Sequence, residues 1–192
     1  GPSGNTVEIL DILDKYDVKA TFFVVGRDKS YYDAYRDIVD RGHTLGLHSY
    51  THDYDKIYGS LADFSEDIDI RNLLYDVTGV NCVYYRFPGG SSNTVSRVDM
   101  NTLIDYVNAE GLIYYDWNAL NNDAVCGSYT PEQLVDNIMK DALQHDDVVI
   151  LMHDLESRHT TVESLPMLIE RLRDDGYELL PIDENAPLIR HR

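Results

Sequence analysis

The 192-residue chain is 43% hydrophobic, which is enough to bury one sizeable core. Its formal net charge of −18, from 34 acidic and 16 basic residues, makes nucleic acids and anionic membranes poor partners. No apolar run approaches the roughly 20 residues that span a bilayer, and no export signal is visible at the N-terminus. We therefore expect a single soluble domain over residues 1–192, without membrane insertion.

Strand and helix patterns alternate along the chain. The predicted strands are mostly continuous apolar runs, as in buried parallel sheets, and cover residues 20–25, 44–48, 83–87, 112–117, 148–153 and 177–182. The predicted helices cover residues 6–16, 31–41, 61–77, 100–110, 131–143 and 161–175. Six such alternations predict an α/β fold with a parallel sheet, either open or closed into a barrel.

The ends of several helices carry sequence signals. Thr130 and Thr160 are each expected to begin a helix as part of a capping box. Gly42, Gly111 and Gly176 are expected to end the helices that precede them. The chain opens with a turn-like segment, residues 1–5, that leads directly into a helix. Either the first strand lies upstream of Gly1 or the sheet begins at Ala20.

Histidines at the ends of predicted strands indicate a metal site. His48 and His52 follow one apolar run and His153 follows another. Two imidazoles four residues apart can share a metal ion, although this spacing also arises by chance. Their position carries more weight, because the carboxyl ends of strands are where α/β folds place their chemistry. A hydrolytic metal site is the first hypothesis.

Over essentially its whole length, the chain resembles the polysaccharide deacetylases of carbohydrate esterase family 4, the NodB-homology domain. Gly1-Pro2 match the end of the family's first motif, and four further motifs follow in the family's order. These are residues 48–52, Arg86-Phe87-Pro88-Gly89-Gly90, the loop after residues 114–117, and Leu151-Met152-His153. The resemblance implies a distorted (β/α) barrel of about seven parallel strands, with the first strand truncated.

The resemblance also implies the chemistry. One divalent metal ion, Zn²⁺ or alternatively Co²⁺ or another transition metal, would be held by His48 and His52 together with an aspartate. The hydroxyl of Ser49 would tie down the loop between them. His153, as imidazolium, would protonate the leaving amine, and Asp123 would pair with His153 and raise its pKa.

Further residues are assigned by the same resemblance. Arg86 would orient the carboxylate of the general base. Pro88 and Gly89 would bind substrate, with the Gly89 backbone N–H donating to the oxyanion. Trp117 and Leu151 would shape an apolar pocket for the acetyl methyl group, although plain core positions are the alternative for both.

The chain departs from the family pattern in two places. The family's consecutive aspartates, the base and a metal ligand, belong immediately before Gly1 and are not in this sequence. We therefore expect residues 1–192 alone to bind zinc weakly and to turn over little. Leu120 stands where many members carry an aspartate, and Ala124 replaces a frequent aromatic residue.

Three functions remain open. The first is N-deacetylation of polysaccharides that contain N-acetylglucosamine, with peptidoglycan ahead of chitin. The second is O-deacetylation of acetylxylan by the same metal chemistry, and the third is a catalytically impaired carbohydrate-binding relic. We expect an extracellular or cell-surface monomer from the resemblance. Cys82 and Cys126 are too few to define a disulfide framework.

Overall fold

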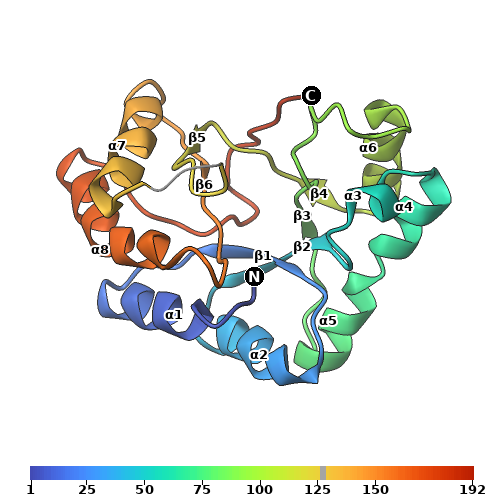
Figure 1. The fold of residues 1–192 in the computed structure, drawn as a ribbon, viewed down its shortest axis with the longest axis horizontal. Helices are drawn as coiled ribbons and strands as arrows, with labels where there is room; N and C mark the ends of the chain where they lie inside the picture. The colour runs from blue at the N-terminus through green and yellow to red at the C-terminus, as the bar shows by residue number, and fades with distance from the viewer. Residues whose placement is uncertain (126–128) are drawn as a thin grey trace. The chain divides into compact units, whose positions relative to one another are not determined.

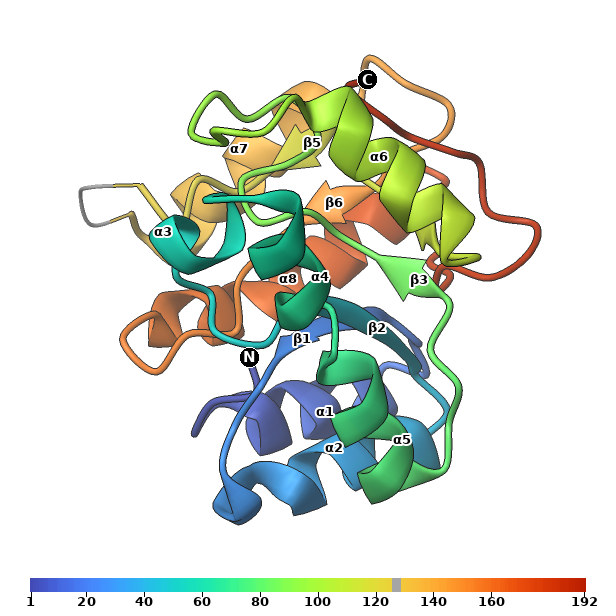
Figure 2. The same ribbon diagram turned by 90° about the vertical axis from the view of Figure 1, so that its right-hand side faces the viewer.

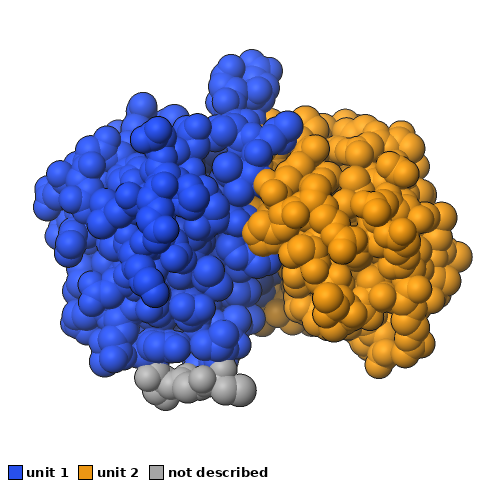
Figure 3. Space-filling view, turned by 90° about the horizontal axis from the view of Figure 1, so that it is seen from above, with its two compact units in different colours: residues 1–21, 40–44, 117–189 blue, residues 22–39, 45–116, 190–192 orange. Residues whose placement is uncertain are grey.

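The computed structural model describes residues 1–125 and 129–192. The chain forms two compact units, each built from separate stretches of sequence (Figure 3). Unit 1 contains residues 1–21, 40–44 and 117–189, and unit 2 contains residues 22–39, 45–116 and 190–192. The single domain expected over residues 1–192 stays a prediction.

Unit 2 is built on a four-stranded sheet with the strand order β1-β2-β3-β4 (Figure 1). Its strands are β1 (Thr21–Val25), β2 (Thr44–Ser49), β3 (Tyr84–Tyr85) and β4 (Ile113–Tyr114), of which β1 and β2 begin in unit 1. The pairs β2–β3 and β3–β4 are parallel, with Leu47 opposite Tyr85 and Tyr85 opposite Tyr114. The expected parallel arrangement is therefore confirmed.

Short helices connect the strands of unit 2. They are η1 (Lys29–Tyr31), α2 (Tyr32–Asp40), α3 (Tyr54–Ile57), α4 (Leu61–Asp67), α5 (Ile70–Thr78) and α6 (Met100–Ala109). Helices α4 and α6 pack together (Figure 2). Phe64 of α4 stacks on Tyr58 and Phe87, with ring centroids 6.3 and 5.8 Å away, and meets Tyr85 edge to face. This aromatic cluster forms much of the unit's core and seats α4 beside the sheet.

Unit 1 combines a two-stranded parallel sheet with three helices. The strands are β5 (Ala119–Leu120) and β6 (Ile150–Leu151), with Leu120 opposite Leu151. Helices α7 (Pro131–Ala142) and α8 (His159–Asp174) pack together over a buried apolar cluster, and α1 (Thr6–Lys15) contacts α8 (Figure 1). The capping box predicted at Thr130 is confirmed, because Thr130 and Gln133 exchange hydrogen bonds.

Other sequence-based expectations differ from the structure. Residues 177–182 are not a strand, because Ile182 is held by the side chains of Thr21 and Thr44 rather than by a strand ladder. Thr160 lies inside α8, which begins one residue earlier. Strand β5 had not been expected from the sequence.

The helix expected over residues 61–77 is two helices, α4 and α5. The physical reason is a contact made outside the helix. The carbonyl of Asp67 accepts from the backbone N–H of Tyr50, while the N–H of Arg71 donates to Ile68 instead. The helical hydrogen-bond ladder is therefore interrupted at Asp67.

Among the residues that the structure describes, no helix is both long enough and apolar enough to cross a bilayer.

Candidate active site

The two histidines predicted as metal ligands lie together in unit 2. His48 is the penultimate residue of β2, and His52 follows in the loop, with the two ring centroids 5.1 Å apart. The Nδ1 atom of His48 lies 2.7 Å from the backbone carbonyl oxygen of Arg86. A carbonyl oxygen can only accept, so Nδ1 carries the proton and Nε2 keeps the lone pair that a metal ion needs.

The surroundings of His48 also favour its neutral form. Burial and the neighbouring His52 lower the pKa of His48 to about 3, against the smaller opposing effect of the hydrogen bond to Arg86. Neutral imidazole is the form that binds metal ions. The pair therefore fits part of a metal site, although the described ranges contain no group of three or more His, Cys, Asp or Glu side chains placed to hold an ion.

Arg86 is buried beside this pair, and its guanidinium is held by hydrogen bonds to backbone carbonyl groups. Its Nε and Nη2 atoms donate to the carbonyls of Tyr115 and Asp116, at 3.2 and 3.0 Å. The guanidinium also lies 4.4 Å from the centroid of the Phe23 ring. Burial lowers the pKa of Arg86 to about 10, against the opposing charge of Asp116, so it remains a cation at neutral pH. Its expected role, orienting a base carboxylate, stays a prediction.

The segment after Arg86 is held from several sides. The Tyr58 hydroxyl donates to the carbonyl of buried Pro88 at 2.7 Å. The fully buried carboxylate of Asp116 accepts from both the backbone N–H and the hydroxyl of Ser91, at 2.8 and 2.5 Å. Gly89 between these anchors is exposed and has a φ of 76°, a conformation that glycine adopts without strain. A fixed, exposed backbone turn is suited to donating an N–H to a ligand.

His153 and Asp123 meet in unit 1. Asp123 Oδ1 lies 2.7 Å from His153 Nδ1, and Oδ2 accepts the backbone N–H of the same histidine at 2.8 Å. Thr161 and Asn121 donate two further hydrogen bonds to Oδ2. Burial raises the pKa of Asp123, but the hydrogen bonds and charge of His153 outweigh burial and hold that pKa below its ordinary value.

The exposure of the two partners differs. The Asp123 side chain is 2% exposed and that of His153 is 36% exposed. The carboxylate is therefore a fixed, buried orienting group, while the imidazole remains accessible. This arrangement is suited to general acid–base chemistry at Nε2.

The remaining predicted site residues belong to unit 1 as well. Trp117 and Leu151 are both half-buried, and Leu151 lies in β6 opposite Leu120 of β5. Leu120 thus occupies a strand position, and Ala124 is exposed in the loop after Asp123. The predicted substrate-binding roles of Pro88, Gly89, Trp117 and Leu151 stay predictions. Cys82 is a buried free thiol, and Cys126 lies outside the described residues.

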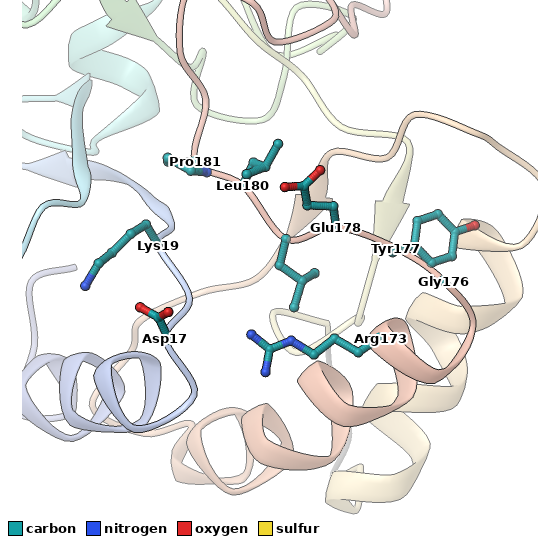
Figure 4. Close-up of a pocket in the computed structure, with 9 residues that line it drawn as sticks. Asp17, Lys19, Arg173, Gly176, Tyr177, Glu178, Leu180 and Pro181 are labelled. Atoms are coloured by element: carbon teal, nitrogen blue, oxygen red, sulfur yellow. The ribbon is translucent and has the colours of Figure 1, made fainter.

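Each unit also has an open cavity. In unit 1 a cavity of about 530 Å³ lies between the end of α8 and residues 17–19, and none of its lining residues is a predicted site residue (Figure 4). In unit 2 a cavity of about 470 Å³ is lined by Tyr50, Thr51 and Asp67, among others, and so borders the loop between the two histidines.

The sequence did not point to several residues that form hydrogen bonds with the predicted site residues or with their neighbours. Thr161 and Asn121 support Asp123, Ser91 binds Asp116, and Asp67 binds the histidine loop. The signal for Asp67 was present, because Phe64, Asp67 and Ile68 have the spacing of a buried helix stripe. An acid at such a position needs polar partners.

The chain is similar to known polysaccharide deacetylases. The family model for polysaccharide deacetylase matches residues 1–104. YheN of Bacillus subtilis is 33% identical over 92% of this chain and 62% of its own length. A bifunctional xylanase/deacetylase of Pseudobutyrivibrio xylanivorans is 32% identical over 96% of this chain and 29% of its own length. The chain thus spans less than two thirds of both relatives.

A solved structure is similar over the whole chain. It is the catalytic domain of a peptidoglycan N-acetylglucosamine deacetylase from Eubacterium rectale, with a TM-score of 0.94 and 37% identity. The alignment covers 100% of this chain and 89% of that one.

Fold and side chains together define an α/β protein with parallel strands, a paired-histidine loop and an Asp–His couple. The chain belongs to the polysaccharide deacetylase family, the NodB-type domain of carbohydrate esterase family 4.

Proposed function

We propose that the protein removes N-acetyl groups from N-acetylglucosamine residues of a polysaccharide, with peptidoglycan as the preferred substrate and chitin-type oligomers next. The observation that carries this proposal is the 37% identity, over the full chain, to a domain described as a peptidoglycan N-acetylglucosamine deacetylase. The paired histidines and the Asp–His couple supply chemistry of the required kind.

The proposed metal ligands from this chain are the Nε2 atom of His48 and the imidazole of His52. A divalent ion held there, Zn²⁺ or Co²⁺, would supply polarisation of the amide carbonyl and acidification of the attacking water. The Arg86 carbonyl keeps the Nδ1 proton of His48 in place, so the tautomer that can bind a metal is the stable one.

His153 handles the proton that the leaving amine requires. Its Nδ1–H is held by Asp123, which leaves Nε2 to donate a proton to the nitrogen of the broken amide bond. The carboxylate fixes the orientation of the ring. Gly89 is proposed to donate its backbone N–H to the oxygen that gains negative charge.

A second candidate is O-deacetylation of acetylxylan. It is favoured by the similarity to the Pseudobutyrivibrio protein, whose name joins a xylanase with a deacetylase. The same residues would act on an ester, whose leaving group is an alcohol and so depends less on protonation by His153. We further propose that the protein works as a monomer at or outside the cell surface, where such polymers occur.

The test is acetate release by the natural protein, with Zn²⁺ or Co²⁺ supplied, from peptidoglycan, chito-oligosaccharides and acetylxylan. Release from peptidoglycan or chito-oligosaccharides that requires the metal and is lost in His153→Ala is expected. Release from acetylxylan alone would favour the second candidate. Bound metal without release from any of the three would favour a carbohydrate-binding relic instead.

A further inference from the structure

Asp67, the last residue of α4, contacts every residue between the two histidines. Its Oδ2 accepts the hydroxyl of Ser49 at 2.6 Å, and its Oδ1 accepts both the backbone N–H and the hydroxyl of Thr51 at 2.9 Å. Its backbone carbonyl accepts the N–H of Tyr50 at 3.1 Å. Asp67 is 5% exposed, so these hydrogen bonds form largely out of water.

The carboxylate determines the direction of the Ser49 hydroxyl. A hydroxyl has one proton to donate, and an ionised carboxylate can only accept. Ser49 therefore gives its proton to Asp67 and turns its lone pairs toward other donors. The backbone N–H of His52 donates to this oxygen at 2.8 Å. Asp67, Ser49 and His52 thus form a directed chain of hydrogen bonds.

His52 needs such a restraint because its backbone is in the left-handed region, with a φ of 53°. For a residue with a side chain this conformation is less stable than the ordinary ones, because Cβ lies too close to the backbone carbonyl oxygen. His52 is also exposed, so burial of its ring does little to hold it. The hydrogen bond from its N–H to Ser49 opposes relaxation of the loop.

Anchoring from α4 also explains why the helix ends at Asp67. A carbonyl that accepts from Tyr50 is not available to the helical ladder, and Phe64 fixes α4 against Tyr58 and Phe87. Through α4, the loop is thereby anchored to the aromatic core of unit 2. Rigid support of this kind is what a metal ligand on a loop requires.

We propose that Asp67 is the positioning residue of the loop that joins His48 and His52. Through its hydrogen bonds to Ser49 and Thr51, it holds His52 in the conformation that binds the metal. This inference rests on the proposed function, since it assigns a role toward the metal site. Asp67 itself is not a ligand in this proposal, because its two carboxylate oxygens are already occupied by Ser49 and Thr51.

The test compares Asp67→Asn with Asp69→Asn in the natural protein. Both variants remove one negative charge from the same helix–helix connection, but Asp69 is exposed and its carboxylate accepts from the side chain of Asn72 in α5, at 3.4 Å. An amide at position 67 places an NH₂ group where an acceptor is needed, so at least one of its three donors loses its partner.

Metal affinity is measured with Co²⁺ alone, by titration of its visible absorption against a competing chelator. We expect Asp67→Asn to weaken Co²⁺ binding about 10- to 100-fold, the usual effect of losing a residue that orients a ligand. Asp69→Asn is expected to match the wild type. Hydrogen exchange of the His52 amide in metal-free protein is expected to accelerate in Asp67→Asn alone.

The outcomes separate the two proposals. If the wild type does not bind Co²⁺ through His48 and His52, the proposed metal site fails, and the role of Asp67 fails with it. If the wild type binds Co²⁺ while Asp67→Asn matches it in both affinity and His52 exchange, only the present inference is overturned. Should Asp67→Asn not fold, Ser49→Ala breaks the same chain of hydrogen bonds, and unchanged affinity and exchange in that variant would overturn the inference equally.

Discussion

The two units each fix a histidine at Nδ1, but they do so with different acceptors. In unit 2 the partner of His48 is a neutral backbone carbonyl, and in unit 1 the partner of His153 is the buried carboxylate of Asp123. A backbone carbonyl sets the tautomer of His48 and offsets only a small part of the effect of burial on its pKa, whereas a buried carboxylate places a full negative charge beside the ring of His153. The hydrogen-bond partner of each histidine thus suits the task proposed for it, metal ligand for His48 and proton donor for His153.

The largest expected effect comes from removing a ligand. His48→Ala should lower acetate release by about a thousandfold or more, because metal polarisation contributes several kcal/mol to catalysis. Co²⁺ titration of the same variant should show lost binding. If His48→Ala released acetate at the wild-type rate even after a chelator had removed the metal, the ligand role of His48 would be contradicted.

Removing the proton donor should be smaller in effect and different in kind. His153→Ala is expected to lower the turnover of N-acetyl substrates by roughly 10²-fold, the lower end of the contribution of general acid–base catalysis, while leaving Co²⁺ affinity unchanged. Kinetics and titration on one preparation test both halves of this statement. A parallel loss of metal affinity would show that the two histidines do not divide the work as proposed.

Asp123→Asn sharpens the comparison by making the partner of His153 neutral. The folded-state pKa of Asp123 lies below its ordinary value of about 4, so its contribution to stability is present above that value and is lost as the pH falls through the lowered pKa. Asp123→Asn should therefore be destabilised most near pH 7. Urea unfolding at several pH values measures this difference, which should shrink below about pH 4. If the difference in free energy of unfolding between the wild type and Asp123→Asn did not change with pH, the negative charge of Asp123 would not be the source of its contribution to stability.

An effect confined to the pH dependence of stability is expected at His43 in unit 1, whose Nδ1 accepts a backbone N–H from Ala20. Burial lowers the pKa of His43 to about 4, so the unfolded chain binds a proton more readily than the folded protein. Between about pH 6.5 and pH 4 the wild type should lose up to about 3 kcal/mol of stability through this group. His43→Asn should show a flatter dependence in the same unfolding experiment. An identical slope would rule out His43 as the source.

Much of the candidate site was accessible from the order of motifs. The strand that ends at the paired histidines, the arginine segment and the final histidine were all placed by apolar runs followed by polar residues. The couple formed by Asp123 and His153 was expected from the resemblance, and the two side chains are in contact. The supporting residues were not foreseen, because Thr161 and Asn121 are ordinary helix and loop residues until the fold brings them to Asp123.

By itself, the sequence determined the α/β class, most helix positions and the residues able to carry the chemistry, because hydrophobic period and residue type are local properties. Only the tertiary structure decided that residues 61–77 divide at Asp67, that residues 177–182 form no strand, and which acceptor each histidine meets. Those outcomes depend on hydrogen bonds between residues far apart in the chain, and no local pattern specifies which distant group satisfies a buried donor or acceptor.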